Sequence, residues 1–284
     1  MNEKQLRQLQ LCELDIVTKC AELCDKYNLK YFLMYGTLLG AVRHEGFIPW
    51  DDDMDIGMPR QDYEKFIQIA DKELPDEYKI LHFSKKWNVP NKILRVENVK
   101  TTMIPLDKIG NPVEKLRHGV QIDVFPIDGF PADITNQSRL FKNVRFCMKI
   151  DTFFRQKCSK SYSFSHNVVI VICRMLGFFL GRCYWIEKYN SLLKKYNMND
   201  TPYVSNAGWA FDPYRVYKAD LFKDTVDIKF EGREFKCPKN WKELLTIEYG
   251  DFMALPPLEK RIPLHSNYIY DFEVGYNEWG KYDQ

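Results

Sequence analysis

The sequence contains no apolar run long enough to cross a membrane, which takes roughly 20 consecutive residues. Its most apolar segment, residues 167–185, is interrupted by Arg174 and Arg182. The amino-terminal MNEKQLRQLQ has no apolar core of the kind that a secretory signal needs. We therefore expect a cytoplasmic protein in which residues 167–185 form a buried helix. The alternative is a helix lying in the membrane surface, which would make the protein peripheral at the inner face of the membrane.

A large charge of one sign, paired cysteines and repeats are also missing. The 41 basic and 39 acidic side chains give a formal net charge of +2, without a long basic run, so we expect no nucleic-acid partner. The eight cysteines are scattered without a CxxC pair, which argues against a zinc site and for buried free thiols in a reducing compartment. No internal repeat or low-complexity linker is present.

The composition is that of a globular protein, with 45% apolar and 28% charged residues. A helical period over residues 4–28, a buried strand at 31–35 and short β-like pieces between 78 and 125 predict an α+β core. Residues 135–200 are helical in character, and a hairpin at 226–238 and a helix at 240–250 follow. We expect a catalytic core at 1–134, a helical insertion or appendage at 135–200, and a carboxy-terminal part at 201–284 that completes the core.

Four aspartates, Asp51, Asp52, Asp53 and Asp55, follow the apolar residues FIPW. In a strand over 53–58, Asp53 and Asp55 share one face and the apolar residues share the other. Neighbouring carboxylates repel each other unless a cation neutralises them, so the pattern suggests Mg²⁺ or Mn²⁺. A second alternating segment, VQIDVF, supplies Asp123 as a third carboxylate and places Phe125 on the same side. Three such groups can bind metal that neutralises phosphate oxygens.

Two other interpretations of the aspartates compete with this one. A solvated acidic turn would not normally alternate so regularly with apolar residues. An EF-hand calcium loop starting at Asp51 would need glycine at its sixth position, where Ile56 stands, and glutamate at its twelfth, where Asp62 stands.

The candidate phosphate site precedes the aspartates. Gly36 and Thr37 stand where a strand passes into a helix, with the Thr37 hydroxyl as the expected N-cap, so free backbone N–H groups can face an anion. Arg43, about two helical turns further on, can add a forked contact to phosphate. Ordinary helix capping explains the glycine-threonine step equally well on its own; the aspartates that follow strengthen the phosphate interpretation.

These motifs together resemble the LicD family, a branch of the nucleotidyltransferase superfamily that includes bacterial phosphocholine transferases and resembles fukutin-related proteins. The resemblance is carried by Gly36 to Gly40, Arg43 and the run from Ile48 to Asp55. It continues through Lys92, Thr101, IDVFPID, FEG, YGDFMALPPLEKR and His265. His265 is followed by Ser266, where many members have a second histidine, so the role of His265 stays open.

The resemblance implies a nucleotidyltransferase-like mixed sheet core flanked by helices. It also implies that Asp53, Asp55 and Asp123 are the catalytic and metal-binding residues. Gly36, Thr37 and Arg43 would lie against the donor's phosphates, with Trp50 and Asp51 on the same substrate side.

The function expected from this resemblance is transfer of a phospho-alcohol group, with CDP-choline as the first choice of donor. A sugar hydroxyl of a cell-surface glycan or glycolipid, such as lipopolysaccharide or teichoic acid, would attack the distal phosphorus and release CMP. Trp50, Tyr35 or Trp209 could hold the choline by cation–π contact, although core packing is the default for each. The alternatives are a nucleotidyltransferase that uses a nucleoside triphosphate and releases pyrophosphate, and a non-catalytic partner protein of the same fold.

Overall fold

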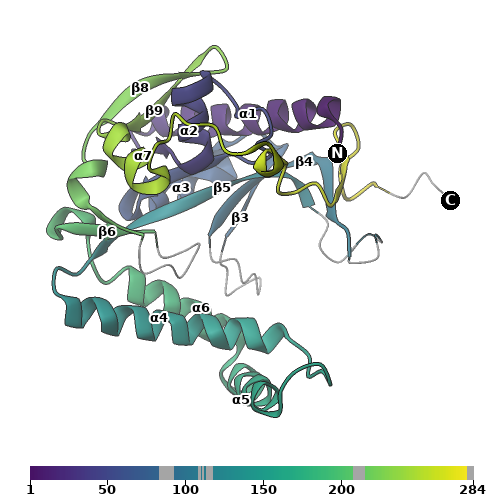
Figure 1. Ribbon diagram of the computed structural model, residues 1–284, viewed down its shortest axis with the longest axis vertical. Coiled ribbons are helices and arrows are strands. Elements are labelled where there is room, and N and C mark those ends of the chain that lie inside the picture. Colours follow the sequence, from purple (N-terminus) through teal and green to yellow (C-terminus); the bar gives the residue numbers. More distant parts are fainter. Residues whose placement is uncertain (83–92, 108–109, 111, 113–117, 207–214, 280–284) are drawn as a thin grey trace. The chain divides into compact units, whose positions relative to one another are not determined.

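The structure is a computed structural model that describes the chain except residues 83–92, 108–109, 111, 113–117, 207–214 and 280–284 (Figure 1). Its contacts divide the chain into two compact units. The first unit holds residues 1–81, 94–125 and 220–284, and the second unit holds 82–93 and 126–219.

The first unit is built on a sheet. Its strands follow the order β1 (Phe32–Leu33), β2 (Asp55–Pro59), β5 (His118–Phe130), β4 (Leu94–Pro105) and β10 (Tyr268–Asp271), and β3 (Tyr78–Leu81) also pairs with β4. The pairs β1–β2, β3–β4, β4–β5 and β4–β10 are antiparallel. A mixed α and β fold is thus confirmed, whereas the nucleotidyltransferase-like arrangement stays a prediction.

In the described part of the chain, four α-helices belong to the first unit, and 3₁₀ turns occur in both units. The helices are α1 (Glu3–Lys26), α2 (Tyr35–His44), α3 (Arg60–Glu73) and α7 (Trp241–Tyr249), and the 3₁₀ turns are η2 (Met198–Asp200), η3 (Ala219–Phe222) and η4 (Leu258–Lys260). The α1 helix begins at a capping box in which the side chains of Asn2 and Gln5 each accept the other's backbone N–H. Its buried stripe includes Leu9, Ile16 and Cys20.

A hairpin closes over the loop before the aspartates. It consists of β8 (Thr225–Phe230) and β9 (Arg233–Pro238), which confirms the predicted hairpin. Its two-residue turn has φ values of 51° at Glu231 and 72° at Gly232, as a type I′ turn requires. The Glu231 carboxylate accepts the Phe47 N–H at 3.2 Å, and Glu231 N–H donates to the carbonyl of residue 45 at 2.8 Å. The FEG motif therefore fixes the loop that leads to the aspartates.

The second unit is mainly helical. It contains α4 (Ile134–Arg155), α5 (Phe164–Leu180) and α6 (Arg182–Leu193), together with the end of β5 and the strands β6 (Tyr203–Ser205) and β7 (Val216–Lys218). Side-chain caps from Asp133 and Ser163 start α4 and α5. Its core is formed by residues of the three helices and β5, among them Phe130, Val144, Cys173, Trp185 and Tyr189.

The expectation of a buried helix at 167–185 is wrong for most of α5. Only Ile170, Cys173 and Gly177 are buried, because one face of the helix alone packs on α4 and α6. No single helix among the described residues is long and apolar enough to cross a membrane. The pair Phe164–Leu180 and Cys183–Asp200, bent by 89° at its break, passes that test by length and composition. All eight cysteines are free thiols, but the expectation that they are buried is wrong for Cys158, which is exposed, and for Cys12 and Cys183, which are half-buried.

Candidate active site

Three backbone contacts bring the predicted site segments together. The Asp55 N–H donates to the Thr37 hydroxyl at 2.8 Å, and the Met34 N–H donates to the Asp55 carbonyl at 3.0 Å. The Asp123 N–H donates to the Met54 carbonyl at 3.2 Å. The first turn of α2, the start of β2 and the middle of β5 therefore meet at the aspartates.

The alternation predicted for the acidic segment is present. Met54, Ile56 and Met58 are at most 1% exposed, whereas Asp53 and Asp55 are half-buried. The strand itself begins at Asp55, so Asp53 lies just before β2.

The carboxyl groups of this cluster are crowded. Burial, together with the charge of Asp53, raises the pKa of Asp51 well above its ordinary value. Burial also raises the pKa of Asp53, and the nearby charges of Asp52 and Asp123 add to this while His265 opposes it. A side-chain hydrogen bond between Asp51 and Asp53 adds to the rise in the pKa of Asp51 and opposes the rise in the pKa of Asp53.

Glu13 joins the cluster from α1, and the sequence analysis missed it. It is 2% exposed, and its Oε2 atom is buried without a hydrogen-bond partner among the described residues. Burial raises its pKa well above the usual range, and the charges of Asp53, Asp52, Asp51 and Asp55 raise it further. A sequence signal existed, because a carboxylate stands between Leu9 and Ile16 on an otherwise apolar helical stripe.

Asp52 is fixed by hydrogen bonds from the carboxy-terminal loop. Its carboxylate is 2% exposed and accepts the backbone N–H groups of Leu264 at 3.1 Å and His265 at 2.6 Å. The Nδ1 atom of His265 lies 3.2 Å from Asp52 Oδ1. This hydrogen bond raises the pKa of His265, and the charges of Asp53 and Asp123 raise it further. The carboxy-terminal loop thereby brings His265, whose role the sequence left open, to the acidic cluster.

Asp123 is held by an ion pair across the sheet. Its residue partner on β4 is Arg95, whose Nε atom lies 2.8 Å from Asp123 Oδ1. Burial raises the pKa of Asp123, and Arg95 opposes that rise. Phe125, predicted on the same side as Asp123, is 2% exposed and packs edge-on against Tyr35.

The three predicted phosphate residues differ in their contacts. A Cβ atom added to Gly36 would lie 2.7 Å from Asp51 Oδ2, so the Asp51 carboxyl lies directly over this glycine. Thr37 is not the N-cap of α2, because the helix begins two residues earlier and its hydroxyl accepts the Asp55 N–H instead. Arg43 donates from Nη1 to the carbonyls of Phe252 at 3.1 Å and Ala254 at 3.2 Å. Its assignment to phosphate stays a prediction.

The aromatic candidates also have defined neighbours. The guanidinium of Arg261 lies over the Trp50 ring, 5.5 Å from its centroid, so this ring already receives a cation. Tyr35 is buried against Phe125. Trp209 lies outside the described residues, as does Lys92 of the family pattern. Thr101 is structural, because its hydroxyl bonds the Asn98 carbonyl at 2.7 Å and the Val120 N–H at 2.8 Å beside the irregularity between β4 and β5.

The acidic cluster offers the oxygen atoms that a divalent cation such as Mg²⁺ prefers as ligands. Among the described residues, no three His, Cys, Asp or Glu side chains are already arranged around one point as a metal site. The chemistry nevertheless fits, because the cluster combines several carboxyl groups whose pKa values are raised and the orphaned Oε2 atom of Glu13. Oxygen donors are what Mg²⁺ and Mn²⁺ prefer, and a bound cation would remove the repulsion that raises these pKa values.

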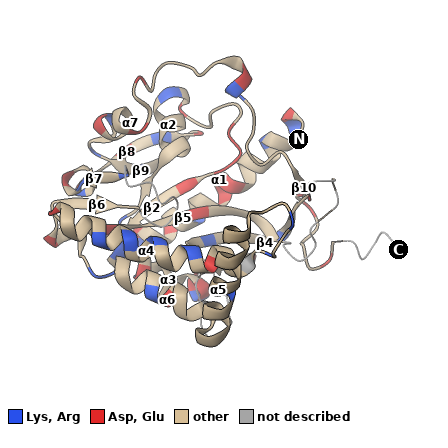
Figure 2. Cartoon of the chain, turned by 60° about the horizontal axis from the view of Figure 1, so that its bottom comes forward, with Lys and Arg blue, Asp and Glu red and all other residues tan. Residues whose placement is uncertain are grey.

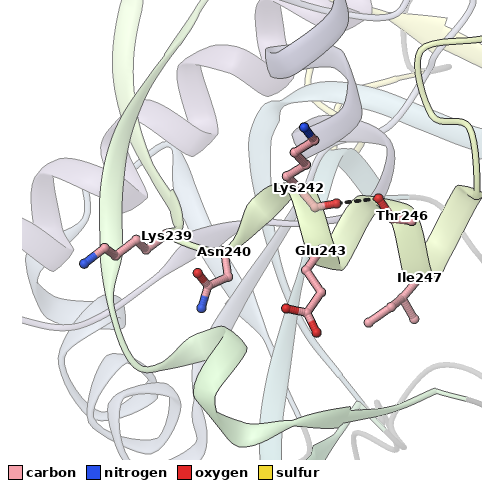
Figure 3. A pocket seen from close by; sticks show the side chains of 6 residues that line it. All are labelled: Lys239, Asn240, Lys242, Glu243, Thr246 and Ile247. Atoms are coloured by element: carbon pink, nitrogen blue, oxygen red, sulfur yellow. Dashed lines mark hydrogen bonds between the residues drawn. The ribbon is translucent and has the colours of Figure 1, made fainter.

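A separate surface pocket of about 480 Å³ lies against α7 (Figure 3). It is lined by Lys239, Asn240, Lys242, Glu243, Thr246 and Ile247. None of these residues belongs to the acidic cluster, so this pocket is not the candidate active site.

Comparisons with known proteins match the region that carries the cluster. Residues 28–167 match the model of the LicD/FKTN/FKRP nucleotidyltransferase domain, a range that includes the four aspartates of the acidic segment and Asp123. The chain is 28% identical over 283 residues to lipopolysaccharide cholinephosphotransferase LicD of Haemophilus influenzae, covering 95% of this chain and 99% of the relative. An uncharacterized protein of Rickettsia typhi is 51% identical over 61 residues, 22% of this chain and 20% of that protein.

The two findings agree with the sequence resemblance and extend it. The domain match contains the aspartates, Gly36, Thr37 and Arg43, and the alignment with the Haemophilus protein runs along nearly the whole chain. This protein belongs to the LicD family.

Proposed function

We propose that this protein is a metal-dependent phosphotransferase that moves phosphocholine from CDP-choline to a sugar hydroxyl of a cell-surface glycan or glycolipid, such as lipopolysaccharide. The observation that carries the proposal is the meeting of Asp53, Asp55 and Asp123 inside the matched LicD domain. The name of the Haemophilus relative, a lipopolysaccharide cholinephosphotransferase, supports the choline head group and the acceptor class. Teichoic acid is the second acceptor to test.

Asp53, Asp55 and Asp123 would hold Mg²⁺ or Mn²⁺, which would neutralise charge on the phosphate oxygens of the donor. Asp123 and His265 are the two groups suited to take the proton of the attacking hydroxyl. The ion pair with Arg95 favours a charged Asp123 despite its burial. His265 lies on the carboxy-terminal loop, and the charges of Asp53 and Asp123 act on its ring.

In the proposed reaction, the sugar oxygen forms a bond to the distal phosphorus while the bond from that phosphorus to the bridging oxygen breaks. CMP leaves with that oxygen, and the hydroxyl proton passes to Asp123 or His265. Arg43 is close enough to Asp51 for that charge to act on its guanidinium, and it would bind the phosphates of the donor. The Trp50 ring would receive the choline head group, which would have to share the ring with the Arg261 guanidinium or displace it.

The second candidate is nucleotidyl transfer from a nucleoside triphosphate. The description of the matched domain as a nucleotidyltransferase domain favours it. The two reactions differ in which phosphorus is attacked, so the released product distinguishes them: CMP for phosphocholine transfer, pyrophosphate for nucleotidyl transfer.

The deciding experiment is calorimetric titration of the purified protein with CDP-choline, CDP-ethanolamine, CDP-glycerol, CDP-ribitol and CTP, with and without Mg²⁺. We expect CDP-choline to bind best, and only with metal. Asp53→Ala should lose this binding. The matched control is Asp76→Ala, which removes a fully exposed carboxylate that lies 3.8 Å from the Lys79 ammonium. Selective binding of CTP would replace the proposal with nucleotidyl transfer, and preference for another CDP-alcohol would change the head group.

A further inference from the structure

The outer face of α5 is a wide apolar surface that no described residue of the second unit covers. Its exposed apolar residues on one side of the helix are Phe164, Val168, Val171, Ile172, Met175, Phe178 and Phe179. At 3.6 residues per turn these positions fall within about 120° of the helix circumference. No charged residue interrupts the stripe, and Phe178 and Phe179 are 80% and 74% exposed.

The opposite side of α5 already has its packing partners. Ile170, Cys173 and Gly177 are buried, and a Cβ atom added to Gly177 would lie 2.2 Å from the Phe154 ring of α4. The helix is therefore apolar on both sides, but the core of the second unit needs only one of them. A contiguous exposed apolar face of this kind marks an interaction surface.

The charge of the same region indicates what covers that face. Residues 134–195 contain twelve Lys and Arg but only two Asp and Glu, whereas the whole chain has a net charge of +2. Of the two acidic residues, Asp151 is buried, which leaves Glu187 as the exposed one. Figure 2 shows basic residues repeated along α4. Three of them, Lys142, Arg145 and Lys149, line a pocket of about 280 Å³ with Phe146.

Basic side chains also lie at the edge of the apolar face. Lys157 and Lys160 are exposed in the segment just before α5, and Arg174 of α5 donates to the Gln156 carbonyl at 3.1 Å. An apolar stripe bordered by cations is the pattern of a helix that lies in the interface of an anionic lipid layer.

We propose that the outer face of α5 docks on an anionic lipid surface, with Phe178 and Phe179 entering the acyl region and the surrounding lysines and arginines contacting the headgroups. A second copy of the chain fits less well, because a symmetric dimer would bring two strongly basic units together. The proposal does not depend on the proposed function. If that function holds, docking would concentrate the enzyme where a lipid-borne acceptor lies.

The test is sedimentation of the full-length protein with vesicles of phosphatidylglycerol and phosphatidylcholine mixed at about 3:7, and with phosphatidylcholine alone. We expect at least about tenfold stronger partitioning to the anionic vesicles. The double substitution Phe178→Ser with Phe179→Ser should lower partitioning by at least about 30-fold, because two large apolar side chains no longer enter the lipid. Lys157→Glu with Lys160→Glu should lower it about tenfold on the anionic vesicles only.

The matched control is Leu258→Ser with Ile262→Ser, which removes two exposed apolar side chains from another part of the chain. It should bind vesicles like the wild type, and circular dichroism should show that every variant is folded. Equal binding of the wild type and the phenylalanine variant would overturn the proposal. So would a wild-type dimer, seen by sedimentation velocity without lipid, that the phenylalanine variant converts to monomer while neither binds vesicles. Resistance of bound protein to alkaline carbonate extraction would replace docking with insertion of the α5–α6 pair.

No donor, acceptor or metal is present in this assay. Failure of the docking proposal therefore leaves the proposed reaction untouched, and an inactive enzyme that still binds vesicles would leave docking intact.

Discussion

The acidic cluster of the first unit and the outer face of α5 in the second unit break opposite rules of protein stability. The cluster buries carboxyl groups that repel one another, and their pKa values rise as a result. The α5 face exposes large apolar side chains that a core would normally cover. Both features cost stability in the isolated chain, and each would be relieved by a different ligand: a cation for the first, a lipid surface for the second.

The comparison teaches that the two features can be separated experimentally. Changes in the cluster should alter catalysis, metal binding and pH dependence, and should leave vesicle binding unchanged. Changes on α5 should do the reverse. The predictions below test this separation from the side of the cluster.

The largest effect is expected for Asp53→Ala. Transfer should fall by at least about 10³-fold, because a group that stabilises charge in the transition state is lost. The melting temperature of the metal-free protein should stay the same or rise, since one of several repelling carboxyl groups is removed. Parallel measurements of transfer rate, thermal melting and vesicle sedimentation check this.

Asp76→Ala is the control for the loss of a carboxylate as such, and all three measurements should match the wild type. If Asp53→Ala lost activity and thermal stability together, Asp53 would have a structural role. If it also lost vesicle binding, the two regions would not be independent.

A smaller effect, and on stability, is expected for Asp52→Asn. The amide cannot accept at both positions, so the N–H of Leu264 or His265 would lose its acceptor in a buried setting. Such a loss costs about 2–3 kcal/mol, or a fall in melting temperature of roughly 4–12 °C for a chain of this size. Thermal melting of this variant beside Asp76→Asn is the measurement. A variant as stable as the wild type would show that Asp52 does not anchor the carboxy-terminal loop.

The contrast between Asp52 and Asp53 also marks how far the sequence could lead. Alternation around Met54 and Ile56, and around Val120 and Ile122, was enough to predict the buried faces of β2 and β5 and to bring Asp123 toward the aspartates. Alternation is a local property of the sequence, so it could not distinguish Asp52 from the three other aspartates of the segment. Its hydrogen bonds go to residues more than 200 positions away, which no local pattern reports.

Long-range packing explains the other differences as well. Phe125 is buried because Tyr35 packs against it from α2. Thr37 could not be recognised as the acceptor of the Asp55 N–H, because that contact depends on how α2 meets β2. For α5 the apolar composition was read correctly, but composition does not say which face of a helix has a partner. Only the packing of Gly177 on Phe154 and the exposure of Phe178 decide that.

The smallest effect is expected for Glu13→Gln, and its sign depends on pH. The folded protein raises the pKa of Glu13 above its ordinary value of 4.5, so the folded state holds this proton more tightly than the unfolded state. Its stabilising contribution is complete below pH 4.5 and is lost as the pH rises through the raised pKa. Glutamine keeps the neutral form at every pH. The variant should therefore melt like the wild type at low pH, and about 2–4 °C higher at pH 8 without metal.

Mg²⁺ should remove or reverse this advantage of the Glu13→Gln variant, because the wild type gains a ligand oxygen that the variant lacks. Melting curves of both proteins across pH, with and without Mg²⁺, measure both effects, and an advantage that does not grow with pH would mean that Glu13 does not share in the crowding of the cluster.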